Sequence, residues 1–125
     1  VNEPDIPVLD AAVLEELSAS VGGDRGFVVE LIRTYFDDTE SQLAQIEAAL
    51  AAEDASALIR PAHTLKSSSA TLGAERLADR ARALEIAGRS ERIDDESRAD
   101  GEKIREDWQD AKVALQEWTT RSDAS

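Results

Sequence analysis

Hydrophobic residues recur along the chain at intervals of three and four, the spacing that places side chains on one face of an α-helix. Several of these stripes follow a side chain that can cap a helix N-terminus, namely Asp10, Asp24 and Asp54. No segment alternates between apolar and polar residues as a strand does. We predict helices between Asp10 and Gly22-Gly23, from Asp24 to Leu50, from Asp54 to Leu72-Gly73, from Leu77 to Gly88 and from Glu91 to Thr119.

Four of these helices are substantial and are joined by short loops. This pattern predicts an all-α fold, an antiparallel up-down-up-down four-helix bundle with the short first helix as a lid or flank. Trp108 and Trp118 lie on the apolar seam of the last helix, so we expect them in the core. The predicted domain spans residues 9–120, between a proline-containing lead-in over residues 1–8 and a tail over residues 121–125.

The third predicted helix has one apolar face and one unusual exposed face. At about 100° per residue, one set of side chains falls within about 40° of a single direction and should be buried. That set is Leu58, Ala62, Leu65, Ser69 and Leu72. His63 points about 140° away from the reference direction. Its neighbours on the helix surface are Arg60 at i−3, Lys66 at i+3, Ser67 at i+4 and, two turns on, Ala70 at i+7.

The net charge of −13 over 125 residues is unevenly distributed. Residues 60–92 contain seven basic and four acidic residues, so the single histidine lies in a basic segment of an acidic chain. The overall charge argues against nucleic acid as a partner. No apolar run is long enough to cross a membrane, so we expect no membrane contact. The chain has no cysteine, which is consistent with a reducing compartment, and we expect a cytoplasmic protein.

The surroundings of His63 suit a phosphoryl group. Small residues leave room for another protein, and Arg60 and Lys66 can balance a phosphoryl dianion. A neighbouring cation also favours the neutral, nucleophilic imidazole. An exposed histidine beside two cations is nevertheless common on ordinary protein surfaces, so this pattern alone leaves an inert surface residue open.

Residues 62–74, with the sequence AHTLKSSSATLGA, resemble the signature of histidine phosphotransfer domains. That signature has a histidine, a hydrophobic residue two positions on, a lysine three positions on, then small residues and a Leu-Gly closure. The resemblance extends upstream through Leu9-Asp10, Gly22-Gly23-Asp24, Phe27 and residues 30–32, and downstream through Leu77, Leu84 and Glu85. It covers about Leu9 to Trp118 and implies the same helical bundle.

The resemblance implies that His63 accepts a phosphoryl group from a receiver-domain aspartate and passes it to another receiver aspartate. It implies that Lys66 stabilises the phosphoryl group. We expect the partner to contact Thr64, Ser67 and Ala70, with Arg60 and Arg82 at the rim of the interface. Ser67 stands where the family often has glycine, which puts the transfer rate and the choice of partner in question.

The expected chemistry needs no cofactor on this chain. The sequence lacks a phosphate-binding loop and a Gly-rich nucleotide loop, so we expect a phosphocarrier without ATP binding or kinase activity of its own. Phosphoryl transfer usually uses Mg²⁺, which we expect on the receiver. The acidic pairs Asp37-Asp38 and Asp94-Asp95 are interpreted as solvated helix faces or ends. The expected partners are receiver domains and a hybrid sensor histidine kinase, on this chain or another, and we expect a monomer.

Three alternatives stay open. A dimerisation domain of a sensor kinase usually has an acidic residue directly after the histidine, whereas Thr64 follows His63 here. A chemotaxis-type module phosphorylated by its own kinase would have the same fold. A helical adaptor could bind receivers without being phosphorylated, although the His63–Lys66 pair argues against it.

Overall fold

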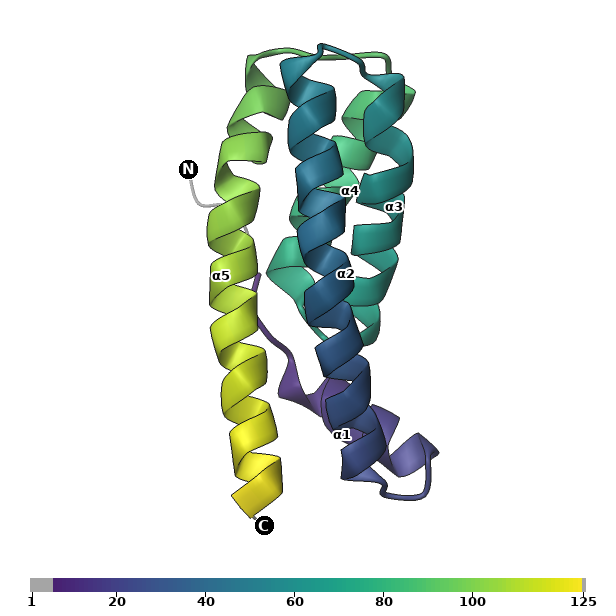
Figure 1. Cartoon of the computed structure of the whole chain (residues 1–125), viewed down its shortest axis with the longest axis vertical. Coiled ribbons are helices and arrows are strands. Elements are labelled where there is room, and N and C mark those ends of the chain that lie inside the picture. The colour runs from purple at the N-terminus through teal and green to yellow at the C-terminus, as the bar shows by residue number, and fades with distance from the viewer. Residues whose placement is uncertain (1–5, 125) are drawn as a thin grey trace.

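The computed structural model describes residues 6–124, and the side chains as far as residue 121. Its helices are α1 (Ala11–Ser20), α2 (Arg25–Ala51), α3 (Ser56–Thr71), α4 (Glu75–Arg89) and α5 (Asp95–Ala124). Helices α2 to α5 stand side by side, and α1 lies across one end of the bundle (Figure 1). Each bundle helix packs against its neighbours in sequence, and α5 closes the ring against α2. The predicted four-helix bundle with a short extra helix is confirmed.

The N-terminal caps predicted for α1 and α2 are present. The carboxylate of Asp10 accepts a hydrogen bond from the Ala12 amide at 3.1 Å, and that of Asp24 accepts one from the Phe27 amide at 3.0 Å. The predicted cap Asp54 lies one residue before the N-cap position of α3, which Ala55 occupies, although its carboxylate still accepts the Ala57 amide at 3.3 Å. These bonds satisfy backbone donors that have no partner within the first helical turn.

The prediction for the start of the last helix was wrong by four residues. The helix begins at Asp95 rather than Glu91, because Asp94 and Ser97 form a reciprocal cap. The Asp94 carboxylate accepts the Ser97 amide, and the Ser97 hydroxyl accepts the Asp94 amide, each at 2.9 Å. The helix then continues to Ala124, beyond the predicted end at Thr119.

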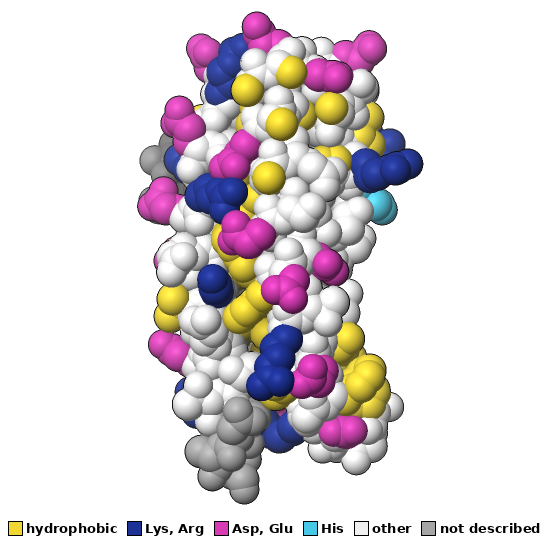
Figure 2. Space-filling model, viewed as in Figure 1, with side chains coloured by type: hydrophobic (Ala, Val, Ile, Leu, Met, Phe, Trp, Pro, Cys, Tyr) yellow, Lys and Arg dark blue, Asp and Glu magenta, His cyan; other side chains and the backbone are white. Residues whose placement is uncertain are grey.

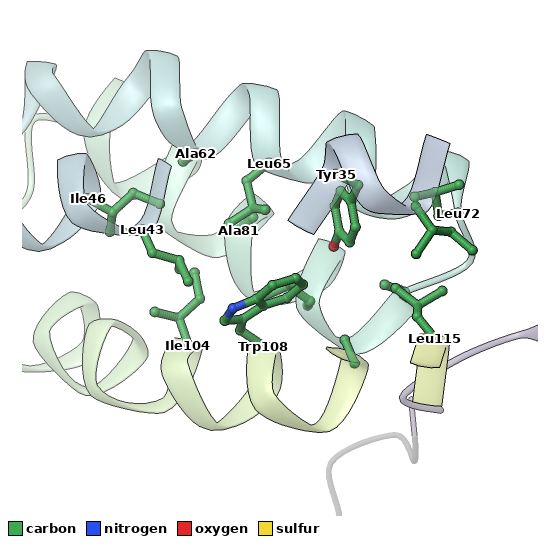
Figure 3. Close-up of a cluster of buried hydrophobic side chains, with 14 of the residues drawn as sticks. Tyr35, Leu43, Ile46, Ala62, Leu65, Leu72, Ala81, Ile104, Trp108 and Leu115 are labelled. Carbon is green, nitrogen blue, oxygen red and sulfur yellow. The ribbon is translucent and has the colours of Figure 1, made fainter. Parts of the chain in front are cut away.

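The core lies where the four bundle helices face one another (Figure 3). The whole predicted stripe of α3 is buried, as are Trp108 and Trp118 of α5. The ring of Trp108 meets that of Tyr35 edge-on, with 5.5 Å between centroids. Tyr35 also shares a 2.7 Å hydrogen bond with the hydroxyl of Ser69, which gives this polar pair a partner inside the bundle.

Several contacts hold α1 and the segment before it against the bundle. Leu14 is fully buried, and the indole of Trp118 donates a hydrogen bond to Glu15 at 3.1 Å. The carbonyl oxygens of Ile6 and Pro7 accept bonds from Arg76 of α4. Residues 1–5 of the expected lead-in lie outside the described residues. Within residues 6–124, no helix combines the length and apolar content of a membrane span.

Candidate functional site

The fold places His63 on the outer face of α3. The helix continues through Pro61 without interruption, and the side chain of His63 is 53% exposed. Figure 2 shows the single histidine at the edge of the molecule, beside a basic side chain. The outward orientation predicted from helix periodicity is therefore confirmed.

The imidazole is held by a carboxylate of the next helix. Nδ1 of His63 lies 3.1 Å from Oε2 of Glu85, and Nζ of Lys66 lies 2.7 Å from Oε1 of the same residue. The side chain of Glu85 is only 7% exposed. The predicted pair of His63 and Lys66 thus converges on one buried carboxylate of α4.

Helices α3 and α4 approach closely enough for this contact because of Gly88. A Cβ atom at that position would lie 2.9 Å from the carbonyl oxygen of Ala55 and 2.9 Å from a side-chain carbon of Ile59. Such distances are too short for a methyl group, so a glycine is needed at the crossing. The close crossing puts Glu85, less than one turn earlier on α4, within reach of α3.

A fourth side chain completes the cluster. Arg89, one turn after Glu85 on α4, donates to Oε2 of Glu85 from Nε at 2.9 Å and from Nη2 at 2.8 Å. The ammonium of Lys66, assisted by Arg89 and His63, lowers the pKa of Glu85 from 4.5 to about 2, against the opposing effect of burial. Glu85 is therefore ionised at neutral pH.

The ionised carboxylate determines which ring nitrogen of His63 carries the proton. A carboxylate can only accept a hydrogen bond, so the nitrogen facing it must donate one. Nδ1 of His63 accordingly carries hydrogen in the neutral ring. Nε2 is then left with its lone pair, on the side of the ring away from Glu85. The geometry can support nucleophilic attack by Nε2.

The other predicted residues lie around this cluster without entering it. Arg60, Thr64, Ser67 and Ala70 are all exposed on α3. Arg82 is exposed on α4, and its guanidinium pairs with Asp79 at 2.5 Å. These four residues therefore lie on the same helix as His63. Arg82 lies on the neighbouring helix, where it is paired with Asp79.

Sequence reasoning missed Glu85 and Arg89 as members of the site. Glu85 had been noted only as part of the family resemblance. Helix periodicity gave one signal. At about 100° per residue, Glu85 lies about 80° around the helix from Leu77, which places it at the edge of the apolar face of α4. A carboxylate in that position needs a cation, and Arg89 at i+4 supplies one.

The acidic pairs interpreted as solvated helix faces or ends lie on α2 and at the start of α5. Asp37 and Asp38 are exposed on α2, and Asp94 caps α5. Across the described part of the chain, no three acidic, histidine or cysteine side chains come together as metal ligands would.

The chain was compared with known proteins. The Hpt domain family matches residues 30–122. The phosphorelay protein LuxU of Vibrio harveyi is 29% identical over 97 residues, which cover 78% of this chain and 83% of LuxU. The crystal structure of histidine-containing phosphotransfer protein B from Pseudomonas aeruginosa PAO1 matches with a TM-score of 0.81 and 29% identity, covering 92% of this chain and 96% of that one. The family match spans most of the chain and includes the whole α3–α4 cluster. The chain therefore belongs to the Hpt domain family, and its function is histidine phosphotransfer in a multistep phosphorelay.

Proposed function

We propose that Nε2 of His63 accepts a phosphoryl group from a receiver-domain aspartate and passes it to a second receiver aspartate. The observation that carries this proposal is the 3.1 Å contact between Nδ1 and buried Glu85. It leaves the unprotonated nitrogen on an imidazole that is 53% exposed. A nucleophile for another protein's phosphoryl group needs both a free lone pair and access.

The phosphoryl transfer to His63 requires no proton transfer. The Nε2 lone pair forms the P–N bond while the P–O bond of the aspartyl phosphate breaks, and its electron pair stays on the receiver carboxylate. The ring of His63 then carries a positive charge, with Nδ1 still bonded to hydrogen. Glu85 accepts that hydrogen bond before and after transfer, so its negative charge stabilises the phosphorylated ring.

Lys66 supplies positive charge on the same face. Lys66 lies on the turn of α3 that follows His63. Its Nζ atom contacts Glu85 of α4, and its side chain is 31% exposed. An ammonium on a flexible stem can turn towards a phosphoryl group attached to Nε2. Its role is to balance the charge of that group during transfer.

The receiver provides what this chain does not. The aspartate and the Mg²⁺ ion belong to the receiver, and the phosphocarrier neither binds ATP nor acts as a kinase. The receiver packs over Thr64, Ser67 and Ala70, with Arg60 and Arg82 at the rim of the interface. Phe27 of α2, which is 46% exposed, adds apolar surface towards the end of the bundle where α1 lies. The donor is a hybrid sensor kinase, and the carrier works as a cytoplasmic monomer.

The test is phosphoryl transfer from a phosphorylated, Mg²⁺-loaded receiver domain to the native chain and to His63→Gln. Acid-labile label is expected on the native protein alone, with the helical circular dichroism of both proteins unchanged. In addition, ¹⁵N NMR of the native imidazole should show the proton on Nδ1. Labelling of His63→Gln, or a proton on Nε2, would contradict the proposal. Absence of label from a broad receiver panel, with the fold intact, would favour a kinase-linked module or a non-phosphorylated adaptor.

A further inference from the structure

The cluster on α3 and α4 contains two cations for one carboxylate. Oε1 of Glu85 faces Lys66 at 2.7 Å, while Oε2 takes both bonds from Arg89 and the contact from His63. Lys66 alone would already neutralise the carboxylate in the resting protein. The second cation is therefore in excess until negative charge arrives at the site.

Phosphorylation of His63 creates a conflict for Lys66. A phosphoryl group brings nearly two negative charges to Nε2, and a nearby carboxylate repels it. If Lys66 turns to the phosphoryl group, its contact with Glu85 is lost. Without Arg89, Glu85 would then be a carboxylate that is 7% exposed and that shares the positive charge of the His63 ring with the phosphoryl group. A buried carboxylate without a cation of its own is costly.

Arg89 can resolve this conflict because its pairing with Glu85 is internal to α4. Glutamate followed by arginine at i+4 is a favourable order on a helix, and both donors come from one planar guanidinium. The pair therefore does not depend on where Lys66 or the partner protein lies.

We propose that Arg89 is a positioning residue that keeps Glu85 neutralised and oriented, so that Lys66 can leave Glu85 for the phosphoryl group on His63. This inference rests on the proposed role of His63. Arg89 acts through Glu85 and does not itself contact the phosphoryl group.

Arg82 provides a matched control. It is also an exposed arginine of α4, with a side chain 59% exposed against 58% for Arg89, and its ion pair is with Asp79 rather than Glu85. Removing either arginine takes one positive charge from the same helix. Because Arg82 is also placed at the rim of the receiver interface, the two variants are compared in labelling by a small phosphoryl donor without a receiver. In that reaction, loss through Glu85 is specific to Arg89.

The experiment measures single-turnover transfer from a phosphorylated receiver, and also labelling by phosphoramidate, a small phosphoryl donor that needs no receiver. The proteins are native, Arg89→Ala, Arg89→Gln, Arg89→Lys, Arg82→Ala, Lys66→Ala and the double variant Lys66→Ala with Arg89→Ala. Circular dichroism checks the fold of each. Arg89→Gln serves in place of the alanine variant if that one is unfolded.

We expect Arg89→Ala to slow both reactions relative to the native protein. In phosphoramidate labelling it should be slower than Arg82→Ala on the order of tenfold, which corresponds to the loss of one hydrogen-bonded charge. Arg89→Lys should recover part of the rate because it keeps the charge without the planar fork. In the Lys66→Ala background, the effect of Arg89→Ala should shrink towards that of Arg82→Ala, because there is no ammonium left to release.

A spectroscopic readout separates this role from a purely structural one. On phosphorylation, the ¹⁵N resonance of Lys66 Nζ should shift in the native protein and in Arg82→Ala, and should stay near its resting value in Arg89→Ala. Equal rates of phosphoramidate labelling for Arg89→Ala and Arg82→Ala, or additive effects of Lys66→Ala and Arg89→Ala, would overturn the inference. Failure to label native His63 at all would instead overturn the proposed function.

Discussion

At the residue scale, Glu85 links the groups to which we assign the chemistry. It receives His63 and Lys66 from one helix and Arg89 from its own. Because these donors all favour its ionised form, the same contacts that orient the imidazole also stabilise the fold. A change in the charge of Glu85 should therefore be visible in stability as well as in transfer.

The stability contributed by Glu85 should depend on pH in a defined direction. Its pKa falls from 4.5 to about 2 on folding, so its contribution is complete above pH 4.5 and is lost as pH falls towards 2. Glu85→Gln should therefore be less stable than the native protein at about pH 6, and the difference should shrink at about pH 3. Urea unfolding of both proteins at the two pH values measures this, and a difference independent of pH would contradict it.

At the scale of elements, α1 depends on the turn between α3 and α4. Gly73 in that turn has φ +81°, and its carbonyl oxygen accepts the Asp10 amide at 2.8 Å. On the other side of α1, Glu15 joins it to Trp118 of α5 and, through a 2.6 Å ion pair, to Arg25 of α2. Helix α1 is thereby attached to the bundle through Asp10 at its N-terminus and through Glu15.

Two glycine substitutions separate backbone strain from close packing. A Cβ at Gly73 would lie 2.6 Å from the Asp10 carbonyl oxygen, whereas one at Gly22, with φ +72°, would meet nothing within 4 Å. Gly22→Ala should destabilise by about 1 kcal/mol through strain alone. Gly73→Ala should cost about 2 kcal/mol or more, because Asp10 must also move. Urea unfolding gives both values, and equal losses would show that the contact with Asp10 is relaxed cheaply.

At the scale of the whole molecule, charge distinguishes the His63 face from the rest of the surface. The chain has a net charge of −13, yet residues 60–92, which include most of α3 and all of α4, are net positive. Arg60, Arg82 and Arg89 are all exposed there. A partner whose docking face is acidic is therefore attracted to this side of the bundle and repelled elsewhere.

This asymmetry predicts that transfer from a receiver slows as salt is added. The apparent second-order rate should fall about tenfold or more from low to high ionic strength, because screening weakens the attraction of the two proteins. Arg60→Ala, which removes one exposed charge of that face, should give a shallower dependence. A rate that does not respond to salt would mean that encounter is not steered by these charges.

Much of the fold could be predicted from the chain itself. The apolar stripes, the caps Asp10 and Asp24 and the outward direction of His63 depend on residues within one or two helical turns of one another, so helix geometry was sufficient. The start of α5 was predicted wrongly because helix periodicity does not mark the residue at which a helix begins, whereas the reciprocal bonds of Asp94 and Ser97 do.

The candidate site, like the fold, could be predicted only in part from the sequence. The sequence by itself determined that His63 is exposed on a helix with Lys66 beside it, because both lie on one element whose period is known. Only the tertiary structure decided that Glu85, 22 residues away, meets the imidazole. That contact depends on how closely α3 and α4 cross at Gly88, and helix periodicity carries no information about the distance between two helices.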